Sequence, residues 1–496
     1  MVYCCLRRGR FVLYIIANKC MLVGDFFFFP YFTGKELHFM SQSHLAERQN
    51  PFVQGPILSA LIRFSLPLML SLLLQALYGG VDLAVVGQFS PTASAAAVAT
   101  GSQVMQCATV LITGLTMGVT VCLGKAMGAR DMDNAAAAVA GQIRLFALVA
   151  VILTVVMILF APQAARWMHV PEEALEETVR YIRICSGGMV FITAYNGISG
   201  IFRGVGNSRS PFLFVLIACV VNVVLDLVFV AVFHMAASGA ALATVIAQAV
   251  SVAFSAAYLR RHPLPFSLTR DCFAQKGTVS HILKVGAPIA LQDFLVNLSF
   301  LIITSIVNTL GLAASAGIGV SEKLFVFLSI VPMAFMSALS AFVAQNMGAG
   351  QPQRARQALR CAQGISFCFG VATFLLTFLT GDVLASVFDQ DPAVITATQQ
   401  YLKSSGFEYL ITPLTFCFLG YFNGREHTGF VMFQGLFSAF LVRVPASYLL
   451  SRLPGAGMFT IGLAVPISAL CSILFCLVFF LYLQRKEPPI CGSRAG

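Results

Sequence analysis

The feature that most constrains this sequence is a series of apolar runs, each about twenty residues long, that recur over nearly its whole length. A helix of about twenty residues crosses a hydrocarbon layer about 30 Å thick. Only 10% of the 496 residues are charged and 58% are hydrophobic, whereas a soluble domain is typically about 25% charged. The sequence lacks the short alternating segments of a membrane β-barrel. We therefore expect an all-α polytopic membrane protein.

Polar connections rich in glycine and proline divide the sequence into twelve predicted membrane-spanning helices. The longest connection, RRHPLPFSLTRDCFAQKG, begins at Arg260 in the middle of the chain and has six spans on each side. The predicted spans are residues 58–88, 94–122, 140–161, 181–203, 211–233, 238–260, 281–309, 313–341, 362–387, 400–423, 429–451 and 460–484. The predicted organisation is an N-lobe at 40–260, a cytoplasmic linker at 261–280, a C-lobe at 281–484 and a cytoplasmic tail at 485–496.

The first 39 residues do not fit this pattern. They have a basic start and an apolar body that Lys19 and Asp25 interrupt, and no small-residue cleavage site follows. A signal peptide and a thirteenth helix are both alternatives for this segment. Met40, however, opens the plain polar stretch MSQSHLAERQNPF. We therefore expect translation to begin at Met40 and residues 1–39 to be a non-native or disordered extension.

The distribution of lysine and arginine predicts the orientation of the chain. If Leu61 lies near the cytoplasm, the inner segments after residue 40 contain nineteen of these residues and the outer loops contain five. The positive-inside rule then places both termini in the cytoplasm. We expect a multi-pass protein of the plasma membrane, which is the inner membrane of a bacterial cell. The net charge of +11 is spread over short loops, so a nucleic-acid partner is not expected.

The two predicted lobes repeat each other in sequence. AMGA begins at Ala126 and NMGA at Asn346, while IFRGVGNS begins at Ile201 and YFNGREHT at Tyr421. Both pairs have the same offset of 220 residues (346 − 126 and 421 − 201). Because each lobe has an even number of spans, both enter the membrane from the same side and are related by an axis along its normal. This pseudo-symmetry predicts transport by rocking of one lobe against the other; a duplicated bundle with a purely structural role is the alternative.

A few ionisable residues lie inside the predicted spans, where a charge is costly and by default faces a cavity or a partner. At a rise of about 1.5 Å per residue, Asp82, Asp226 and Thr244 all lie about 10 Å below the outer surface. Asn222 is one turn before Asp226 on the same helix face. Such oxygen ligands suit a hard cation, and two desolvated carboxylates can also share a proton. We predict a cation-coupling site for H+ or Na+ at these four residues, with hydrogen bonding between helices as the structural alternative for Asn222 and Asp226.

The C-lobe contains its own candidate residues. Glu408 is predicted at a depth similar to that of Asp82, and Arg443 is a candidate counter-ion for it. Asp293 lies near the inner side, at a depth that does not match Glu408. Glu408, Asp293 and Arg443 are therefore the candidates for a C-lobe cation or substrate site. Glu322, beside Lys323, is interpreted as a packing or pairing residue.

The sequence contains no enzyme constellation and no cofactor motif. The seven histidines are dispersed, and neither HExxH nor a P-loop is present. The fourteen cysteines show no CxxC and no Cys/His spacing, so we expect them to pack as small apolar residues without a disulfide framework or a metal site. Na+ at the Asp82 site is the one metal ion that we expect.

Nine motifs together are similar to those of one transporter family. They are LPLMLSLLLQALYGGVDLAVVG from residue 66, GKAMGARDMDNA from 124, FRGVGNS from 202, NVVLD from 222, GAALAT from 239, ALQDFLVNLSFLIITSIVNTLG from 290, EKLFVF from 322, AQNMGAG from 344 and GYFNGREHT from 420. On these motifs, over roughly residues 50–485, the chain resembles the multidrug and toxic compound extrusion (MATE) family. The resemblance implies export of bulky, often cationic compounds, driven by inward flow of H+ or Na+.

The same resemblance implies roles for particular residues. The family's coupling aspartate in the first helix corresponds to Asp82, and its N-lobe cation site corresponds to Asn222, Asp226 and Thr244. Its carboxylate in the tenth helix corresponds to Glu408, where close relatives usually have aspartate. The glutamate that some members carry in the seventh helix corresponds here to the apolar Val296, with Asp293 nearby.

Two other functions remain as alternatives. A flippase for lipid-linked oligosaccharides, from the same superfamily, usually carries several arginines in its central cleft, and Arg443 is almost alone here. A receptor that binds without transporting is the second alternative. We expect a monomer in the lipid bilayer that takes small drug-like molecules as substrates.

Overall fold

The structure, a computed structural model, describes residues 51–168 and 170–486. Within these ranges the chain is almost entirely helical and contains no strand. The extension expected at residues 1–39 and the end of the tail, 487–496, lie outside the described residues.

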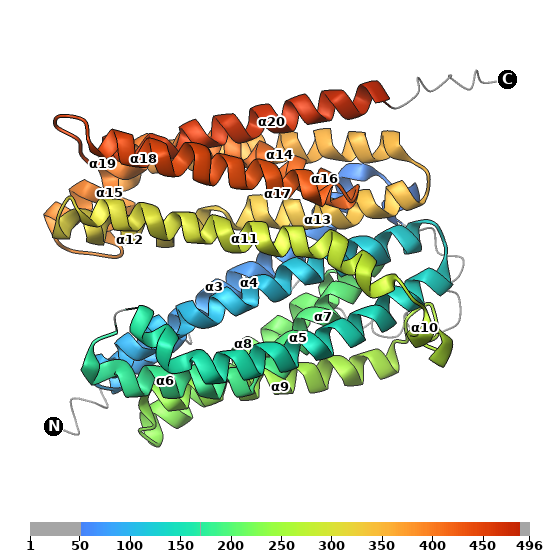
Figure 1. Ribbon diagram of the computed structural model, residues 1–496, viewed down its shortest axis with the longest axis horizontal. Coiled ribbons are helices and arrows are strands. Elements are labelled where there is room, and N and C mark those ends of the chain that lie inside the picture. Colours follow the sequence, from blue (N-terminus) through green and yellow to red (C-terminus); the bar gives the residue numbers. More distant parts are fainter. Residues whose placement is uncertain (1–50, 169, 487–496) are drawn as a thin grey trace, which may run out of the picture. The chain divides into compact units, whose positions relative to one another are not determined.

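The described helices follow one another with short connections (Figure 1). A short helix, α2 (Pro51–Gln54), precedes the N-lobe. The N-lobe consists of α3 (Ile57–Phe89), α4 (Thr92–Gly128), α5 (Met132–Trp167), α6 (Glu172–Gly187), α7 (Met189–Val205), α8 (Arg209–Asp226), the π-helical segment η1 (Leu227–Val232) and α9 (Ala236–Arg261). After α10 (Arg270–Ala274), the C-lobe consists of α11 (Thr278–Asn308), α12 (Leu312–Leu328), α13 (Ile330–Gly348), α14 (Pro352–Ser386), α15 (Pro392–Ser405), α16 (Glu408–Gly424), α17 (Thr428–Leu436), the π-helical segment η2 (Phe437–Arg443), α18 (Val444–Ser451), α19 (Met458–Gly462) and α20 (Ala464–Lys486).

Several of the twelve predicted spans are broken helices. Ten described helices are long and apolar enough to cross a membrane, and the pair α6 and α7, bent by 49°, makes eleven. The span predicted at 400–423 corresponds to α15 and α16, which have 14 and 17 residues, each fewer than the roughly 20 that one span needs. The span predicted at 313–341 is likewise divided into α12 and α13. Apolar composition reports the length of a span but not where its backbone bends, so these breaks were not predicted.

The connections of the two lobes share the same backbone geometry at one end of the bundle. We call this the basic end; α4, α7, α9, α13 and α16 all finish there. Arg130 (φ 59°) follows α4, and Gly350 (φ 69°) follows α13; both have a left-handed backbone. Gly206 (φ 96°) after α7 and Glu426 (φ 62°) after α16 form a second left-handed pair. Both pairs are 220 residues apart, and left-handed residues terminate helices. The sequence repeat is therefore also a repeat of helix ends.

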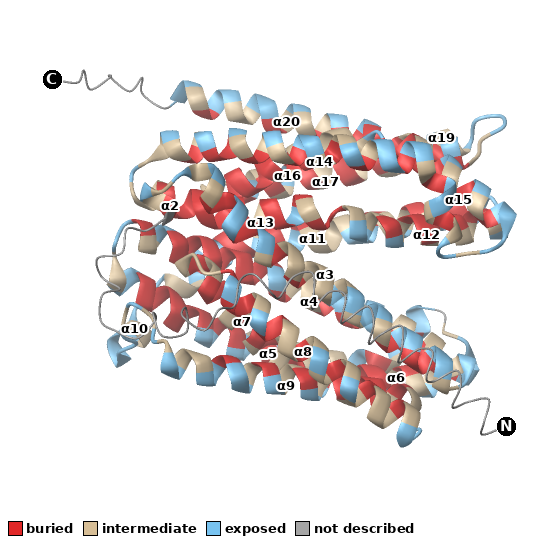
Figure 2. Ribbon diagram, turned by 180° about the vertical axis from the view of Figure 1, so that it is seen from behind, coloured by how far each residue is buried: buried red, intermediate tan, exposed pale blue. Residues whose placement is uncertain are grey.

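Burial separates central helices from those that face outward. In the most apolar 18-residue stretch of each helix, 72% of the residues are buried in α4 and 78% in α13. The corresponding share is only 22% in α5 and in α14. Figure 2 shows the buried residues concentrated between the helices of each lobe and where the lobes meet. The outward faces of the peripheral helices carry large apolar side chains such as Leu159, which is 69% exposed. Such faces suit lipid contact, because the bilayer interior is the apolar solvent of the helix.

The two lobes pack against each other through small residues. The most extensive contact between any two helices joins α4 of the N-lobe to α11 of the C-lobe. A Cβ on Gly118 would lie 2.6 Å from the Cα of Gly286, and a Cβ on Gly114 would overlap the backbone of Ala290. These residues belong to the parts of α4 and α11 nearer the basic end, and the ribbons of α4 and α12 diverge toward the opposite end (Figure 1).

Candidate functional site

Three of the predicted N-lobe residues form a connected polar group. Asp82 lies in the last third of α3, and its side chain is buried. Thr244 of α9 donates a hydrogen bond from Oγ1 to Oδ2 of Asp82 at 3.4 Å. Asn222 of α8 in turn donates from Nδ2 to Oγ1 of Thr244 at 3.5 Å. The helices that the sequence placed at one depth therefore bring these side chains into contact.

Asp226 completes this group from a special position in its helix. It is the last residue of α8, and the π-helical segment η1 follows it directly. Its side chain is fully buried, and its carboxyl group lies near enough to the Asp82 carboxyl group for the two to interact electrostatically. Short π-helical segments are frequent at functional sites, but the sequence did not reveal this one.

The hydrogen bonding of the group is incomplete. Four buried oxygen atoms accept no hydrogen bond from a protein donor: Oδ1 of Asp82, Oδ1 of Asn222 and both carboxyl oxygens of Asp226. Among the described residues, no lysine or arginine forms an ion pair with either aspartate. A buried carboxylate without a counter-charge is costly. A proton or a hard cation such as Na+ would therefore satisfy this all-oxygen site.

Sequence reasoning missed an aromatic neighbour of the site. Tyr78 lies one helical turn before Asp82 in α3 and is within electrostatic reach of its carboxyl group. Tyr181 of α6 is also within reach. The i, i+4 spacing of Tyr78 and Asp82 was visible in the sequence, because residues four apart share a helix face.

The C-lobe candidates form a different kind of cluster. Thr412 donates a hydrogen bond to Oε1 of Glu408 at 3.2 Å. The guanidinium group of Arg443, at the end of η2, lies 4.3 Å from the ring centre of Phe300 and within electrostatic reach of Glu408. The described residues show no direct ion pair between Arg443 and Glu408. Arg443 is therefore a neighbour of Glu408 rather than its partner in a direct ion pair.

Glu322 shares one neighbour, Tyr401, with Glu408 and Arg443. Thr304 of α11 donates a hydrogen bond to its Oε1 at 2.6 Å, and the Tyr401 hydroxyl is within electrostatic reach of Glu322, Glu408 and Arg443. Asp293 does not join them: among the described residues its carboxyl group forms no ion pair. The structure thus brings Glu408 and Arg443 near each other, whereas Glu322 pairs with Thr304 and Asp293 stands apart.

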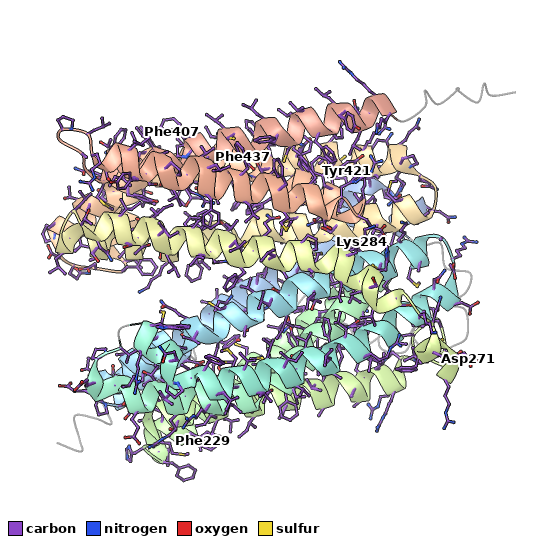
Figure 3. The ribbon with its side chains drawn as sticks, viewed as in Figure 1. Phe229, Asp271, Lys284, Phe407, Tyr421 and Phe437 are labelled. Carbon is purple, nitrogen blue, oxygen red and sulfur yellow. The ribbon has the colours of Figure 1, made fainter. Side chains whose placement is uncertain are left out.

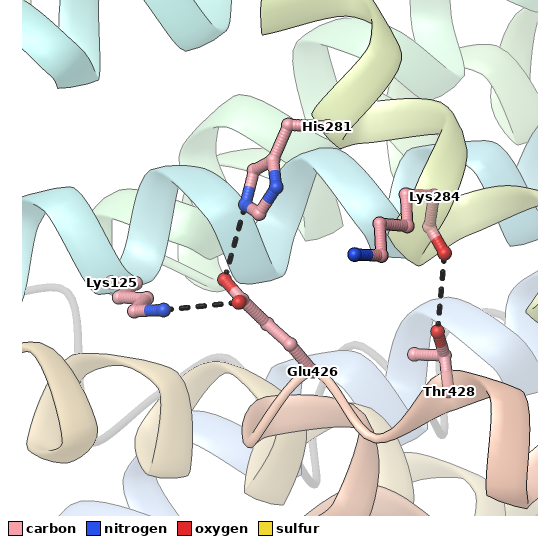
Figure 4. Close-up of polar contacts among 5 residues, drawn as sticks. All are labelled: Lys125, His281, Lys284, Glu426 and Thr428. Carbon is pink, nitrogen blue, oxygen red and sulfur yellow. Dashed lines mark hydrogen bonds and ion pairs between the residues drawn. The ribbon is translucent and has the colours of Figure 1, made fainter.

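A set of polar contacts connects the two lobes at the basic end (Figure 4). Nζ of Lys125 in α4 lies 3.0 Å from Oε2 of Glu426, which belongs to the connection between α16 and α17. Nε2 of His281 in α11 lies 3.3 Å from the other oxygen, Oε1. Thr428 donates a hydrogen bond to the backbone oxygen of Lys284 at 3.5 Å. Figure 3 shows Lys284 toward this end of the molecule and Phe407 toward the other.

Comparison with known families explains the internal repeat. The sequence model of the MatE family matches residues 67–228 and again residues 288–449. The two matches begin at Pro67 and Pro288 and are offset by 221 residues at both ends (288 − 67 and 449 − 228). The family unit is therefore a single lobe, which this chain contains twice.

Relatives and solved structures agree with this match over most of the chain. The probable multidrug resistance protein YpnP of Bacillus subtilis (strain 168) is 27% identical over 436 residues, which are 88% of this chain and 97% of that protein. The multidrug export protein MepA of Staphylococcus aureus (strain MRSA252) is 22% identical and covers 88% of this chain and 96% of its own length.

The same fold is found in a solved structure of an outward-facing multidrug resistance MATE family transporter of the MOP superfamily. That structure superposes with a TM-score of 0.82 at 21% identity and covers 88% of this chain and 97% of its own. The chain therefore belongs to the MATE family, whose members are membrane transporters and not enzymes.

Proposed function

We propose that this chain exports bulky, often cationic organic compounds across the plasma membrane in exchange for inward flow of H+ or Na+. One observation carries the proposal: Asp82 and Asp226 are buried side by side without a basic partner, and Asn222 and Thr244 supply further oxygen atoms. Such a site needs a cation in order to remain stable in an apolar surrounding. Loading and releasing that cation changes the charge inside the N-lobe, which can bias the lobe between two packings.

The arrangement of the lobes supports alternating access. In this structure the lobes pack closely near the basic end, through the glycines of α4 and the contacts of Glu426. The positive-inside rule assigns the basic end, and with it both chain termini, to the cytoplasm. The described conformation is then closed toward the cytoplasm. Rocking of the lobes would open the basic end and close the opposite one.

The C-lobe provides no second copy of the N-lobe site. At the 221-residue offset, Asn222 corresponds to Arg443 and Asp226 to Ser447. A fixed guanidinium group therefore stands where the N-lobe has a neutral amide. We assign ion coupling to the N-lobe and recognition of charged substrate groups to Glu408 and Glu322. One charge crossing 100 mV contributes about 2.3 kcal/mol, enough for roughly a fiftyfold gradient of a neutral solute.

The test is efflux of a fluorescent organic cation from proteoliposomes, with pH and sodium gradients imposed separately. We expect one of the two gradients to drive efflux by the wild-type chain. We expect Asp82→Asn to reduce efflux to the level of empty vesicles, because an amide cannot exchange a proton or balance the charge of Na+. Asp382→Asn, which alters an exposed carboxylate of α14, is the matched control.

Other outcomes would contradict the proposal. Efflux by Asp82→Asn at the wild-type rate would remove this residue from the mechanism. Movement of a fluorescent lipid without movement of the organic cation would support the flippase alternative. Binding without counterflow would support a receptor.

A further inference from the structure

A thiol, an imidazole and a carboxylate from three distant segments meet at the basic end. Cys122 belongs to α4, His281 to α11, and Glu426 to the connection after α16. One donor atom from each residue lies within 4.8 Å of the other two. Cys122 is buried, whereas the His281 side chain is 48% exposed. A buried sulfur and a solvent-accessible imidazole together make a site that an ion can enter from water.

We propose that Cys122, His281 and Glu426 form a transition-metal site, best suited to Zn2+, that bridges the two lobes. Sulfur, nitrogen and oxygen donors are the ligands that Zn2+ prefers, unlike the all-oxygen group at Asp82. The site would have three protein ligands and water as the fourth. On binding, the Cys122 thiol releases its proton to solvent and coordinates as thiolate.

The distances fit this geometry. Nitrogen and oxygen ligands about 2.0–2.1 Å from a tetrahedral Zn2+ lie about 3.3 Å apart. Nε2 of His281 and Oε1 of Glu426 are 3.3 Å apart. The sulfur of Cys122 has to come within about 3.6 Å of each of them. The half-exposed His281 side chain can supply this movement by rotation.

The backbone conformation of Glu426 differs in cost from that of its counterpart in the N-lobe. Glu426 has φ 62°, and its counterpart in the N-lobe, 220 residues earlier, is Gly206 with φ 96°. The left-handed conformation strains a non-glycine residue, because its Cβ crowds the following carbonyl oxygen. The C-lobe therefore carries a carboxylate where glycine would be more stable. Lys125 contacts Oε2 of that carboxylate and leaves Oε1 for the metal; such a partner orients a ligating group.

A metal at this position would affect the movement of the lobes. Cys122 belongs to the N-lobe, whereas His281 and Glu426 belong to the C-lobe, so the bound ion would tie together the two sides that rocking must separate. This consequence rests on the proposed function, whereas metal binding itself does not. Zn2+ on the cytoplasmic side is expected to inhibit efflux.

The test is a titration of the purified full-length chain with Zn2+ against a chelating dye, and with Co2+ followed by absorption. We expect the wild-type chain to bind one more Zn2+ than Cys122→Ser or His281→Ala. In the wild-type chain, Co2+ should produce the near-ultraviolet charge-transfer band of a thiolate ligand. Because the other cysteines of the chain can also bind metal, the difference between variants is the result that counts.

Controls keep the test decisive if one variant misfolds. Lys284→Ala changes a residue one turn from His281 that supplies no ligand, so the full Zn2+ stoichiometry should remain. Glu426→Gly restores the residue type of Gly206 and should lose the site with its fold intact. Any Zn2+ that still binds at this position in His281→Ala should do so at least about tenfold more weakly than in the wild-type chain. Equal Zn2+ stoichiometry and affinity in the wild-type chain, His281→Ala and Glu426→Gly would overturn the proposal.

Inhibition is measured separately from binding. Zn2+ should slow efflux by the wild-type chain, and this effect should be absent in His281→Ala. Metal binding without inhibition would contradict the bridge between the lobes but not the site. A wild-type chain that binds Zn2+ at these residues yet fails to transport would refute the proposed function alone.

Discussion

At the residue scale, equivalent positions in the two lobes have the same left-handed backbone conformation but different side chains. Arg130 and Gly350 follow α4 and α13 with nearly equal φ angles of 59° and 69°. A Cβ on Gly350 would meet no atom within 4 Å. A side chain at this position would therefore not clash with other residues. The cost of replacing Gly350 comes from its positive φ angle alone.

This equivalence predicts opposite effects at the two positions. We expect Arg130→Gly to raise the free energy of unfolding by about 1 kcal/mol and Gly350→Ala to lower it by about 1 kcal/mol, because glycine alone tolerates a positive φ without strain. Thermal denaturation of the purified chain in detergent measures both changes. Shifts of the same sign for the two variants would contradict a shared backbone geometry.

At the scale of elements, the contact of α4 with α11 depends on the absence of side chains. Gly118 faces Gly286 so closely that an added Cβ would lie 2.6 Å from its Cα and 3.0 Å from the backbone oxygen of Ile282. Small residues allow helix backbones to approach closely in membranes. The helices themselves were predicted, but this pairing joins residues more than 160 positions apart in the sequence (286 − 118 = 168).

A bulky residue at Gly118 should hold the lobes apart near the basic end. We expect Gly118→Leu to destabilise the described conformation by about 1–3 kcal/mol and to make Cys122 react at least about tenfold faster with a polar thiol reagent. Labelling in a chain whose only cysteine is Cys122 measures this rate. Gly364→Leu, at a helical glycine of α14 with open space around it, is the control and should leave the rate unchanged. An unaltered rate in Gly118→Leu would show that this contact does not close the basic end.

At the scale of the whole molecule, the two lobes are joined by a few polar contacts and by close packing near one end. The Lys125–Glu426 pair is partly exposed, with side-chain exposures of 49% and 18%. Ion pairs of this kind contribute about 0–1 kcal/mol. Such a contact can bias a conformational equilibrium without locking it, which suits a transporter that must change state repeatedly.

Reversing the charge at Lys125 tests this bias. We expect Lys125→Glu to reduce the population with a closed basic end by up to about fivefold, and the double variant with Glu426→Lys to restore it. Distances between spin labels at positions 173 and 312, on α6 and α12 at the opposite end, report the population. High salt should diminish the difference because it screens exposed charges. Identical distance distributions in the wild-type chain and Lys125→Glu would contradict the bias.

Much of the fold and part of the site could be predicted from the sequence. Helices in lipid must satisfy their own backbone hydrogen bonds, so each span is recognisable as a long apolar run. The 220-residue offset between AMGA at Ala126 and NMGA at Asn346 revealed the two lobes. Counting residues along straight helices placed Asp82 and Thr244 at one depth, and the structure brings their side chains into contact. Asn222, placed by its helix face, contacts Thr244. Their role in ion coupling remains a prediction.

Other features depended on contacts that no sequence pattern records. The breaks in the fourth, eighth and tenth spans and the π-helical segment after Asp226 arise from packing between helices. Glu322, interpreted as a packing or pairing residue, accepts a hydrogen bond from Thr304, a partner that the sequence did not identify. The donors Cys122, His281 and Glu426 are separated by 159 and 145 residues (281 − 122 and 426 − 281), so the search for Cys/His spacing could not find them.

The sequence by itself determined that this chain crosses a membrane as two related lobes and where along each helix its rare charges lie. Both follow from the high cost of exposing polar groups to lipid, which restricts every residue of a span. Only the tertiary structure decided which charges meet, because a cluster needs a helix to be rotated and placed against another as well as a depth. It also decided that the lobes meet near the basic end, where the contact of glycine with glycine sets the distance between them.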